Sequence, residues 1–430
     1  MVLNRLYYSI VIFGYLCCSV RQSITQELEL LAYDQALTQL TSATYTQKPT
    51  SEYPKLTVDD IDRVLDISFH PQHNDIIAIS YEKPQAIEIY RLDGDKWVFL
   101  HKITGFYLPN IKEHIPGKIC WTPLGDAIIG FTKGDYSKSD SLVIAHTTDN
   151  WAHYSTNTVP LTEAAITNWG KILSIIMHGE QRTFFTFGPD NTLAFSGIFK
   201  KQGGVGENTL VICLTQYKHT HNTFTPIALA YIPANLSYIA GFTYPSPKNR
   251  NAPLIALVRE FENYANNPLL VWDIVGNKKT SDNIRAYNIQ KEFTLLSDHN
   301  VYDYIAGYSK TNTDLTLYKS ISFLDGRPSS LYTWSTLAKG GLGLESISYM
   351  AWQNDTTLII TTDFGNPIWS LSIGESPTPK SVVTRSEHAY QHPVKIHTFS
   401  FNASRTHIAY IDSIEFSKHS EKSINIVKLP

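Results

Sequence analysis

Two histidines three residues apart stand out in the stretch SFHPQHNDIIAISY, residues 68–81. Imidazole nitrogens are common metal ligands, so His70 and His73 could share a metal ion if they lay on one helix face. They instead flank Pro71 between two apolar runs, which predicts a turn between strands. Similar stretches elsewhere carry at this place Thr122-Pro123, Gly188-Pro189 and Asn402-Ala403. A repeated turn built from varying residues argues against a metal role.

Two further histidine pairs lead to the same expectation. His219 and His221 are two apart at a strand end and have no third ligand in view, so we expect exposed hairpin residues. His388 and His392 are four apart, as on a helix, but Pro393 and a strand follow, so a loop with a structural His392 is expected. The sequence predicts no metal site.

The remaining motifs assign no catalytic residue and no cofactor. The glycine-rich segments 201–206 and 339–346 lack the Lys-Ser/Thr pair and the strand-to-helix setting of a phosphate-binding loop. We also find no nucleophile elbow, no HExxH zinc motif and no EF-hand loop. Four carboxylates before the first strand, Asp59, Asp60, Asp62 and Asp66, are expected to lie in a solvated connector.

Composition describes a folded chain without an electrostatic specialisation. Of its 430 residues, 43% are hydrophobic and 17% charged, and the net charge is −3 with neutral histidines. No block of Lys and Arg gathers anywhere in the sequence. Nucleic-acid backbones need such clusters, so composition argues against a nucleic-acid partner.

The N-terminus resembles a targeting signal. Asn4-Arg5 precedes an apolar run that ends at Val20, too short for a bilayer-spanning helix and typical of a signal peptide. Residues 1–20 therefore predict a removable leader and a secreted or periplasmic protein with no membrane span after leader removal. The alternative is a buried N-terminal segment in a cytoplasmic or nuclear protein.

Two features bear on an exported chain. Beyond the leader only Cys120 and Cys213 remain; their pairing is open, and no zinc-type spacing exists. Three Asn-X-Ser/Thr sequons begin at Asn235, Asn354 and Asn402, and they matter only in a eukaryotic secretory pathway.

Residues 21–58 predict a helix and a connector. Ser23 and Gln26 form a capping box, and apolar residues at helical spacing follow over 24–40. From residue 59 to 430 helical periodicity is almost absent, and β-branched and aromatic runs alternate with polar turns. This pattern predicts an all-β domain over 59–430.

The β domain consists of seven similar units. Each has a strand, an aromatic residue, a polar turn, a second strand and later a third strand, at a spacing near the roughly 40–50 residues of propeller repeats. The anchoring aromatics are Phe69, Trp121, Phe187, Tyr244, Tyr308, Trp352 and Phe401. The third strands are expected at 86–92, 141–147, 209–215, 269–274, 331–337, 367–373 and 424–430. In the first unit, residues 93–95 (Asp-Gly-Asp) predict a tight turn into a fourth strand.

Seven four-stranded units predict a seven-bladed β-propeller. The chain ends directly after the third strand of the last unit. Because a propeller leaves no unprotected edge, a strand near Pro54–Val58 is expected to complete the last blade.

The repeats resemble WD40 repeats and the related PD40 repeats. The WD40 likeness lies in SFHPQHNDIIAIS with IEIYRL and in NPLLVWDI, which contains Trp272-Asp273; TFGPDNTLAF and SFNASRTHIAYID are more similar to PD40 repeats. In QHPVKIHTFSF, His392 stands where a WD40 repeat carries its histidine, with Asp412 as a turn partner. The resemblance implies a rigid binding platform, usually a subunit of a larger assembly.

Two long insertions are the expected binding elements, because long loops on a rigid scaffold carry function. Segment 161–181 contains Trp169, and segment 260–268 contains Phe261 and Tyr264. Aromatic anchors dominate interfaces; the alternative is that each loop only covers a blade edge.

The leading hypothesis is a non-enzymatic, exported scaffold that binds another protein or a multiprotein complex. One alternative is an intracellular WD40-like subunit of a large assembly. Another is a propeller hydrolase or lyase with its site in the central channel.

Overall fold

The regular structure of the described residues is β, apart from one 3-10 turn, η1 (Ile61–Arg63). A computed structural model describes residues 53–59, 61–81, 86–105, 119–131, 138–139, 141–160, 175–178, 185–187, 191–199, 209–231, 236–243, 254–260, 269–272, 284–287, 295–297, 304–309, 312–319, 330–336, 342–344, 346–362, 368–373, 377–383, 394–396, 399–415 and 420–430. The expected leader and the helix over 24–40 lie outside these residues.

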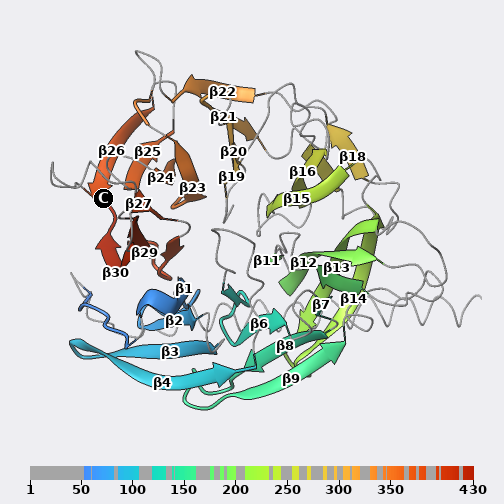
Figure 1. Cartoon of the computed structure of the whole chain (residues 1–430), viewed down its shortest axis with the longest axis vertical. Coiled ribbons are helices and arrows are strands. Elements are labelled where there is room, and N and C mark those ends of the chain that lie inside the picture. Colours follow the sequence, from blue (N-terminus) through green and yellow to red (C-terminus); the bar gives the residue numbers. More distant parts are fainter. Residues whose placement is uncertain are drawn as a thin grey trace, which may run out of the picture. The chain divides into compact units, whose positions relative to one another are not determined.

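Within the described residues, antiparallel strands build six sheets of four strands and one of six (Figure 1). We number the sheets in chain order. Sheet 1 contains β1 (Val64–Phe69), β2 (Ile76–Tyr81), β3 (Ala86–Asp93) and β4 (Lys96–Thr104). Sheet 2 contains β5 (Cys120–Trp121), β6 (Ala127–Phe131), β8 (Ser141–His146) and β9 (Ser155–Pro160). Sheet 3 contains β7 (Lys138–Ser139), β10 (Ile175–His178), β11 (Phe185–Phe187), β12 (Thr192–Phe199), β13 (Thr209–Lys218) and β14 (Thr223–Tyr231).

The remaining sheets follow the same order along the chain. Sheet 4 contains β15 (Leu236–Thr243), β16 (Leu254–Glu260), β17 (Leu269–Trp272) and β18 (Ile284–Tyr287). Sheet 5 contains β19 (Leu295–Leu296), β20 (Tyr304–Ser309), β21 (Asp314–Lys319) and β22 (Ser330–Ser335). Sheet 6 contains β23 (Ile347–Trp352), β24 (Thr357–Thr362), β25 (Ile368–Ser372) and β26 (Thr378–Val383); sheet 7 contains β27 (Val394–Lys395), β28 (Phe399–Phe401), β29 (His407–Glu415) and β30 (Ser420–Lys428).

The repeat pattern located most of these strands. The expected third strands at 86–92, 141–147, 209–215 and 269–274 correspond to β3, β8, β13 and β17. The tight turn after β3 is confirmed as well: Asp93 pairs with Lys96, and Gly94 has a φ of 64°. A two-residue hairpin needs such a positive φ, which glycine adopts without a steric penalty.

Sheet 5 corrects one assignment. Its first strand is β19, only two residues long, so Tyr308 lies on the second strand and the run expected at 331–337 is the fourth strand, β22. Ser297 confirms this order, because its N–H donates to Ala306 O as His70 N–H does to Ile76 O in sheet 1. A two-residue strand has no periodicity to detect, so the sequence could not reveal it.

Part of the expected insertion 161–181 is also a strand. Ile175–His178 forms β10, which pairs with β12 on one side and β7 on the other. β11 pairs with β12 further along its length, so β10 and β11 together act as one interrupted inner strand. The rest of the segment, with Trp169, lies outside the described residues.

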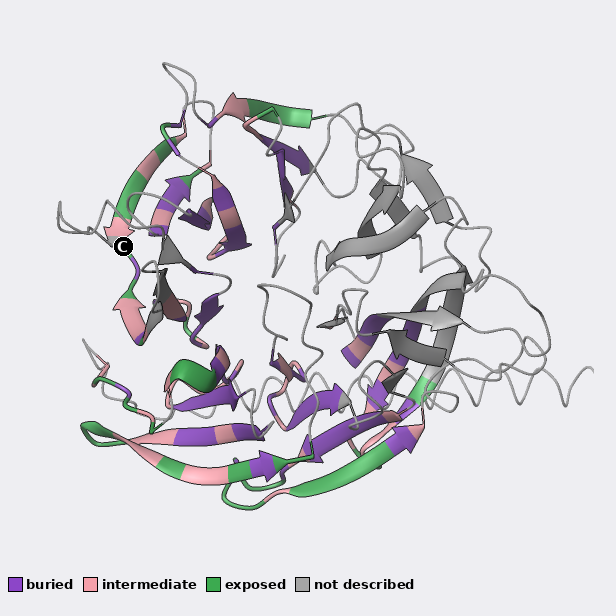
Figure 2. Ribbon diagram, in the orientation of Figure 1, coloured by how far each residue is buried: buried purple, intermediate pink, exposed green. Residues whose placement is uncertain are grey.

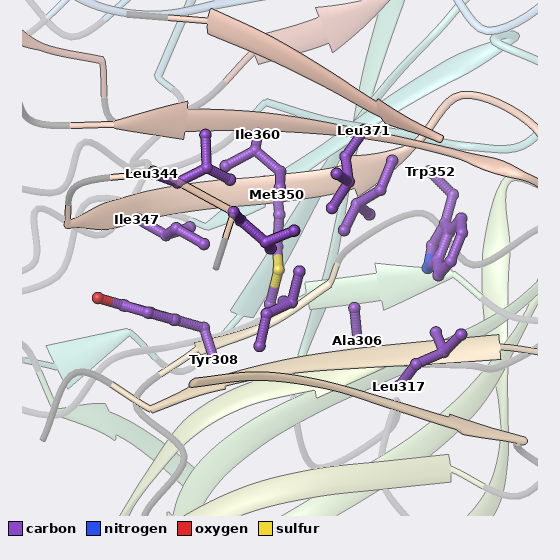
Figure 3. Packing of buried hydrophobic residues seen from close by; sticks show 12 residues of the cluster. Ala306, Tyr308, Leu317, Leu344, Ile347, Met350, Trp352, Ile360 and Leu371 are labelled. Atoms are coloured by element: carbon purple, nitrogen blue, oxygen red, sulfur yellow. The ribbon is translucent and has the colours of Figure 1, made fainter. Parts of the chain in front are cut away.

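Each sheet contacts the next one along the chain, and the last sheet contacts the first. Buried clusters join sheets 1 and 2, 5 and 6, and 6 and 7, and one more joins sheet 7 to sheet 1. Strand contacts of β9 with β14, β11 with β15, and β15 with β19 connect the others. Between sheets 5 and 6, Tyr308, Met350 and Trp352 interdigitate (Figure 3). Buried residues accordingly concentrate on the inner strands of the described part (Figure 2).

The expected closing strand is not formed by residues 53–59, to which no strand is assigned. This segment instead packs by its side chains against the first and last sheets. Leu56 is buried in the cluster that holds Ile77 and Ile424, and Tyr53 stacks on Trp97 at 5.8 Å between ring centroids. Side-chain packing replaces the strand pairing that the edge argument predicted.

The two cysteines do not pair. Cys120 and Cys213 form no disulfide with each other, and Cys213 is buried in β13, where burial raises its pKa. A buried thiol behaves as a small apolar side chain.

Candidate functional site

Large apolar side chains reach solvent at two places in the described part of the chain. They are Phe99 (50% exposed) on β4, and Leu331 (41%) and Tyr332 (36%) on β22. Both strands are the outer strands of their sheets. Exposed aromatic and aliphatic side chains that gather on one element are typical of contact surfaces.

On β22 the exposed Tyr332 stacks on the partly buried Trp334. Tyr332 lies opposite Leu317 and Trp334 opposite Leu315, so both aromatic rings lie on one face of the strand. Their centroids are 5.4 Å apart and the ring planes are 20° apart. Trp334 packs partly buried on the core between sheets 5 and 6. Tyr332 is therefore held by a fixed partner and loses little freedom when it contacts another molecule.

β22 also differs from the other outer strands in its residue types. Charged residues or proline occur in the outer strands of all other sheets: Lys96 and Lys102 in β4, Pro160 in β9, Pro226 in β14, Arg285 in β18, Pro379 and Lys380 in β26, and Lys422 and Lys428 in β30. The sequence of β22, SLYTWS, has neither. Charges and proline keep outer strands from associating, so β22 is the outer strand least protected against association.

The second patch surrounds Phe99. Its ring meets Tyr90 at 5.7 Å in a T-shaped contact. Glu88 lies beside them and accepts hydrogen bonds from Tyr90 Oη (2.8 Å) and Lys102 Nζ (3.0 Å). Burial would raise the pKa of Glu88, but these hydrogen bonds, with one from Tyr81, outweigh it and lower the pKa. The carboxylate is thus ionised and occupied by its own neighbours.

A cluster of titratable side chains links sheets 2 and 3. Asp126 follows β5 and accepts a hydrogen bond from Thr122 Oγ1 at 2.6 Å. Its other oxygen contacts Nδ1 of His219, from the β13–β14 turn. On the far side, Nε2 of His219 lies 2.5 Å from Nδ2 of Asn191. His219 was expected to be an exposed hairpin residue; it lies in that hairpin, but it is held between two sheets.

A carboxylate that orients a histidine is also the arrangement of a general base. Here the second imidazole nitrogen faces the amide of Asn191, where a catalytic arrangement needs a hydroxyl, a thiol or a substrate water. The chain of contacts from Thr122 through Asp126 and His219 to Asn191 therefore connects two sheets.

His70 is a structural residue, as the turn pattern predicted. Its Nδ1 accepts hydrogen bonds from the N–H groups of Gln72 and His73, both at 3.1 Å, and its ring packs against Gly125. Burial, with the charge of His73, lowers the pKa of His70 well below its ordinary value of 6.5. The imidazole is neutral, and its Nδ1 is occupied by the N–H groups of its own turn.

One carboxylate of the expected solvated connector is buried. Asp66 lies in β1, and its Oδ2 accepts a hydrogen bond from Ile119 N–H at 2.7 Å, just before β5. This bond links sheet 1 to sheet 2. The alternating residues of β1 could have predicted this burial, because Asp66 lies within the strand and not in the connector before it.

Most residues singled out from the sequence fall outside the described part: Trp169, Phe261, Tyr264, Asp273 and His392. Trp272 ends β17, paired with Leu254 and Ile284. Asp412 lies within the strand β29, opposite Ser423, and its expected partnership with His392 lies outside the described residues. Sequence reasoning missed Phe99, Leu331 and Tyr332; the lack of charge in SLYTWS was the available signal.

Clustered metal ligands and membrane-spanning helices are both absent from the described residues. No group of three or more His, Cys, Asp or Glu side chains is placed there to hold a metal ion. Within the same residues, no helix has the length and apolar character to cross a membrane.

No protein-family model matches the chain, and no curated protein matches it. Among solved structures, Sqt1 of Saccharomyces cerevisiae matches with a TM-score of 0.49 and 10% identity over 88% of both chains. Hsv2 of Kluyvelomyces marxianus matches with a TM-score of 0.42 and 10% identity over 86% of this chain and 99% of that chain. KlAtg21, in complex with the coiled coil of AgAtg16, matches with a TM-score of 0.47 and 11% identity over 86% of this chain and 100% of that chain. The neighbours are WD40 and other propeller proteins, the class that the repeats resemble.

Proposed function

We propose that this chain is a seven-bladed β-propeller that acts as a non-enzymatic scaffold and binds another protein through the outer strand β22. The observation that carries the proposal is the exposed, uncharged strand β22, on which Leu331 and Tyr332 reach solvent and the Tyr332 ring stacks on Trp334. Aromatic side chains fixed by their neighbours and surrounded by few charges are typical of the energetic centre of a protein interface.

The cyclic contacts of the seven sheets support the rigid platform that such a role needs. Sheet 7 meets sheet 1 through Ser400 Oγ, which lies 3.2 Å from Ser68 Oγ and accepts a hydrogen bond from Phe69 N–H at 3.0 Å. In the proposed closure, Tyr53 and Leu56 pack against the cluster that joins sheet 7 to sheet 1. Export of the protein, with removal of residues 1–20, is part of the same proposal and rests on the leader pattern.

The test is quantitative capture of partners from the cells that make the protein. Tagged wild type and the double variant Leu331→Ala/Tyr332→Ala are compared by mass spectrometry of the bound proteins. We expect at least a tenfold loss of a stoichiometric partner, since interface anchors contribute upwards of about 1–2 kcal/mol each. Lys380→Ala, an exposed change on the outer strand of the next sheet, is the matched control.

Three further arms distinguish the surfaces. Phe99→Ala tests the second aromatic patch, and Trp169→Ala and deletion of 260–268 test the loops proposed from the sequence. If capture is unchanged in the β22 double variant and falls in one of these arms, binding belongs to that other surface. A wild type that captures no stoichiometric partner would overturn the scaffold role.

A further inference from the structure

Two of the three sequons lie in the described part of the chain, and they occupy the same kind of turn with opposite consequences. Asn354-Asp355-Thr356 joins β23 to β24, and Asn402-Ala403-Ser404 joins β28 to β29. The Asn235 sequon begins outside the described residues.

At the first sequon the amide nitrogen is available. Asn354 Oδ1 accepts hydrogen bonds from the Thr356 N–H (3.0 Å) and Thr356 Oγ1 (3.1 Å), which turns the carbonyl inward. Nδ2 donates to no described residue and is not buried, and Asp355 and Thr356 are exposed. A substituent on Nδ2 would leave both hydrogen bonds to Oδ1 in place.

At the second sequon the amide nitrogen is fully engaged. Asn402 is 2% exposed. The two N–H groups of Nδ2 are shared among three acceptors within hydrogen-bond distance, Tyr53 Oη (3.2 Å), Ser404 Oγ (3.0 Å) and Thr406 Oγ1 (3.3 Å). Oδ1 accepts from the N–H groups of Thr406 (2.9 Å) and His407 (3.0 Å). A sugar on Nδ2 would remove a donor and place a large polar group in a buried site, so a chain modified there cannot reach this structure.

We infer that Asn354 is an N-glycosylation site and that Asn402 is excluded from the folded glycoprotein. The donor is a polyprenyl-diphosphate-linked oligosaccharide of the secretory pathway. Asn354 Nδ2 attacks the anomeric carbon, the N–C bond forms, and the bond from that carbon to the diphosphate oxygen breaks. The polyprenyl diphosphate leaves with the electron pair of the broken bond and takes up the proton that the amide loses, and no electrons are exchanged with a redox partner.

The inference rests on the proposed export, so the experiment separates the two. The full chain is translated with microsomes in an Asn235→Gln background, once with its own N-terminus and once behind an added cleavable leader. In the second arm we expect one glycan, removable by peptide N-glycosidase, in the protease-resistant fraction. Glycosylation with the added leader and none with the native N-terminus would overturn export and leave the acceptor site standing.

Matched variants identify the acceptor. The glycan is expected to disappear in Asn354→Gln and in Thr356→Ala, which keeps the asparagine, and to persist in Thr356→Ser. Asn402→Gln should leave the glycan on Asn354 while reducing the protease-resistant fraction. The inference is wrong if the folded protein behind the added leader carries no glycan on Asn354, or if its single glycan survives Asn354→Gln.

Discussion

At the scale of single residues, polar side chains in the first hairpin turn of a sheet accept hydrogen bonds from backbone N–H groups of the same turn. His70 uses Nδ1 for two backbone N–H groups, and Asn402 uses Oδ1 in the same way in sheet 7. Thr122 uses Oγ1 for the N–H of Ala127. A turn needs an acceptor for its inward N–H groups, and several residue types meet that need.

Gly125 occupies a turn position where any side chain would be strained. Its φ is 72°, and a Cβ there would overlap the His70 imidazole. Gly125→Ala is expected to lower the free energy of unfolding by at least about 2 kcal/mol, from backbone strain plus overlap. Gly94→Ala is the control: φ is 64° with nothing within 4 Å, so only the strain of about 1 kcal/mol remains. Urea unfolding measures both; equal losses would contradict the overlap.

Elements of this protein are held to one another by such turns and by their buried acceptors. Gln72 Nε2 donates to Pro123 O at 2.8 Å, and Gln353 Nε2 donates to Arg405 O at 3.0 Å. Each bond joins the first turn of one sheet to the first turn of the next. A change in one such turn therefore also affects the neighbouring sheet.

The turn after β1 makes stability pH-dependent. The pKa of His70 is well below 6.5 in the folded protein because burial disfavours the cation. The unfolded chain takes up this proton as pH falls below about 6.5, so stability is full above that pH and decreases below it, by up to about 1.4 kcal/mol per pH unit. His70→Asn keeps a side-chain acceptor and removes the titration.

Urea unfolding between pH 7.5 and 5 checks this expectation, with wild type and His70→Asn compared at each pH. The variant should lose less stability on acidification than the wild type. Other buried histidines, such as His407, contribute equally to both proteins and cancel in the difference. Parallel curves for the two proteins would contradict the assignment to His70.

At the scale of the whole molecule, the contact between sheet 7 and sheet 1 is the one that chain order does not supply. It contains the Ser68–Ser400 contact and the buried cluster around Leu56. Lys422 Nζ adds hydrogen bonds to Asp62 O (2.7 Å) and Val64 O (3.1 Å). Stability of the whole domain depends on this contact, because every other pair of neighbouring sheets is also joined by the chain.

Leu56→Ala tests how much the N-terminal segment contributes to that contact. Leu56 is buried between the two sheets, so we expect a loss of roughly 2–4 kcal/mol in the free energy of unfolding. Lys55→Ala changes the exposed neighbouring residue and should stay within about 0.5 kcal/mol of wild type. Similar values for the two variants in thermal or urea unfolding would show that residues 53–59 do not stabilise the closure.

The sequence by itself determined the all-β class and most strands of the described part. Alternating apolar residues and turn residues are local, and the repeat shows them several times, so β3, β8, β13 and β17 begin where they were expected. The same local signal identified His70 as part of a turn. It could not reveal β19, because two residues carry no pattern, or Asp412 within β29.

Only the tertiary structure decided which distant side chains meet and which surfaces stay exposed. Asp126 and His219 come together from two sheets, Asp66 turns inward to Ile119, and residues 53–59 pack between the first and last sheets without forming a strand. Leu331 and Tyr332 reach solvent because β22 is outermost in its sheet. The two described sequons are alike in sequence, yet burial makes Asn402 a structural residue and leaves the Asn354 amide open. Burial depends on neighbours far away in the chain, and local sequence patterns do not contain that information.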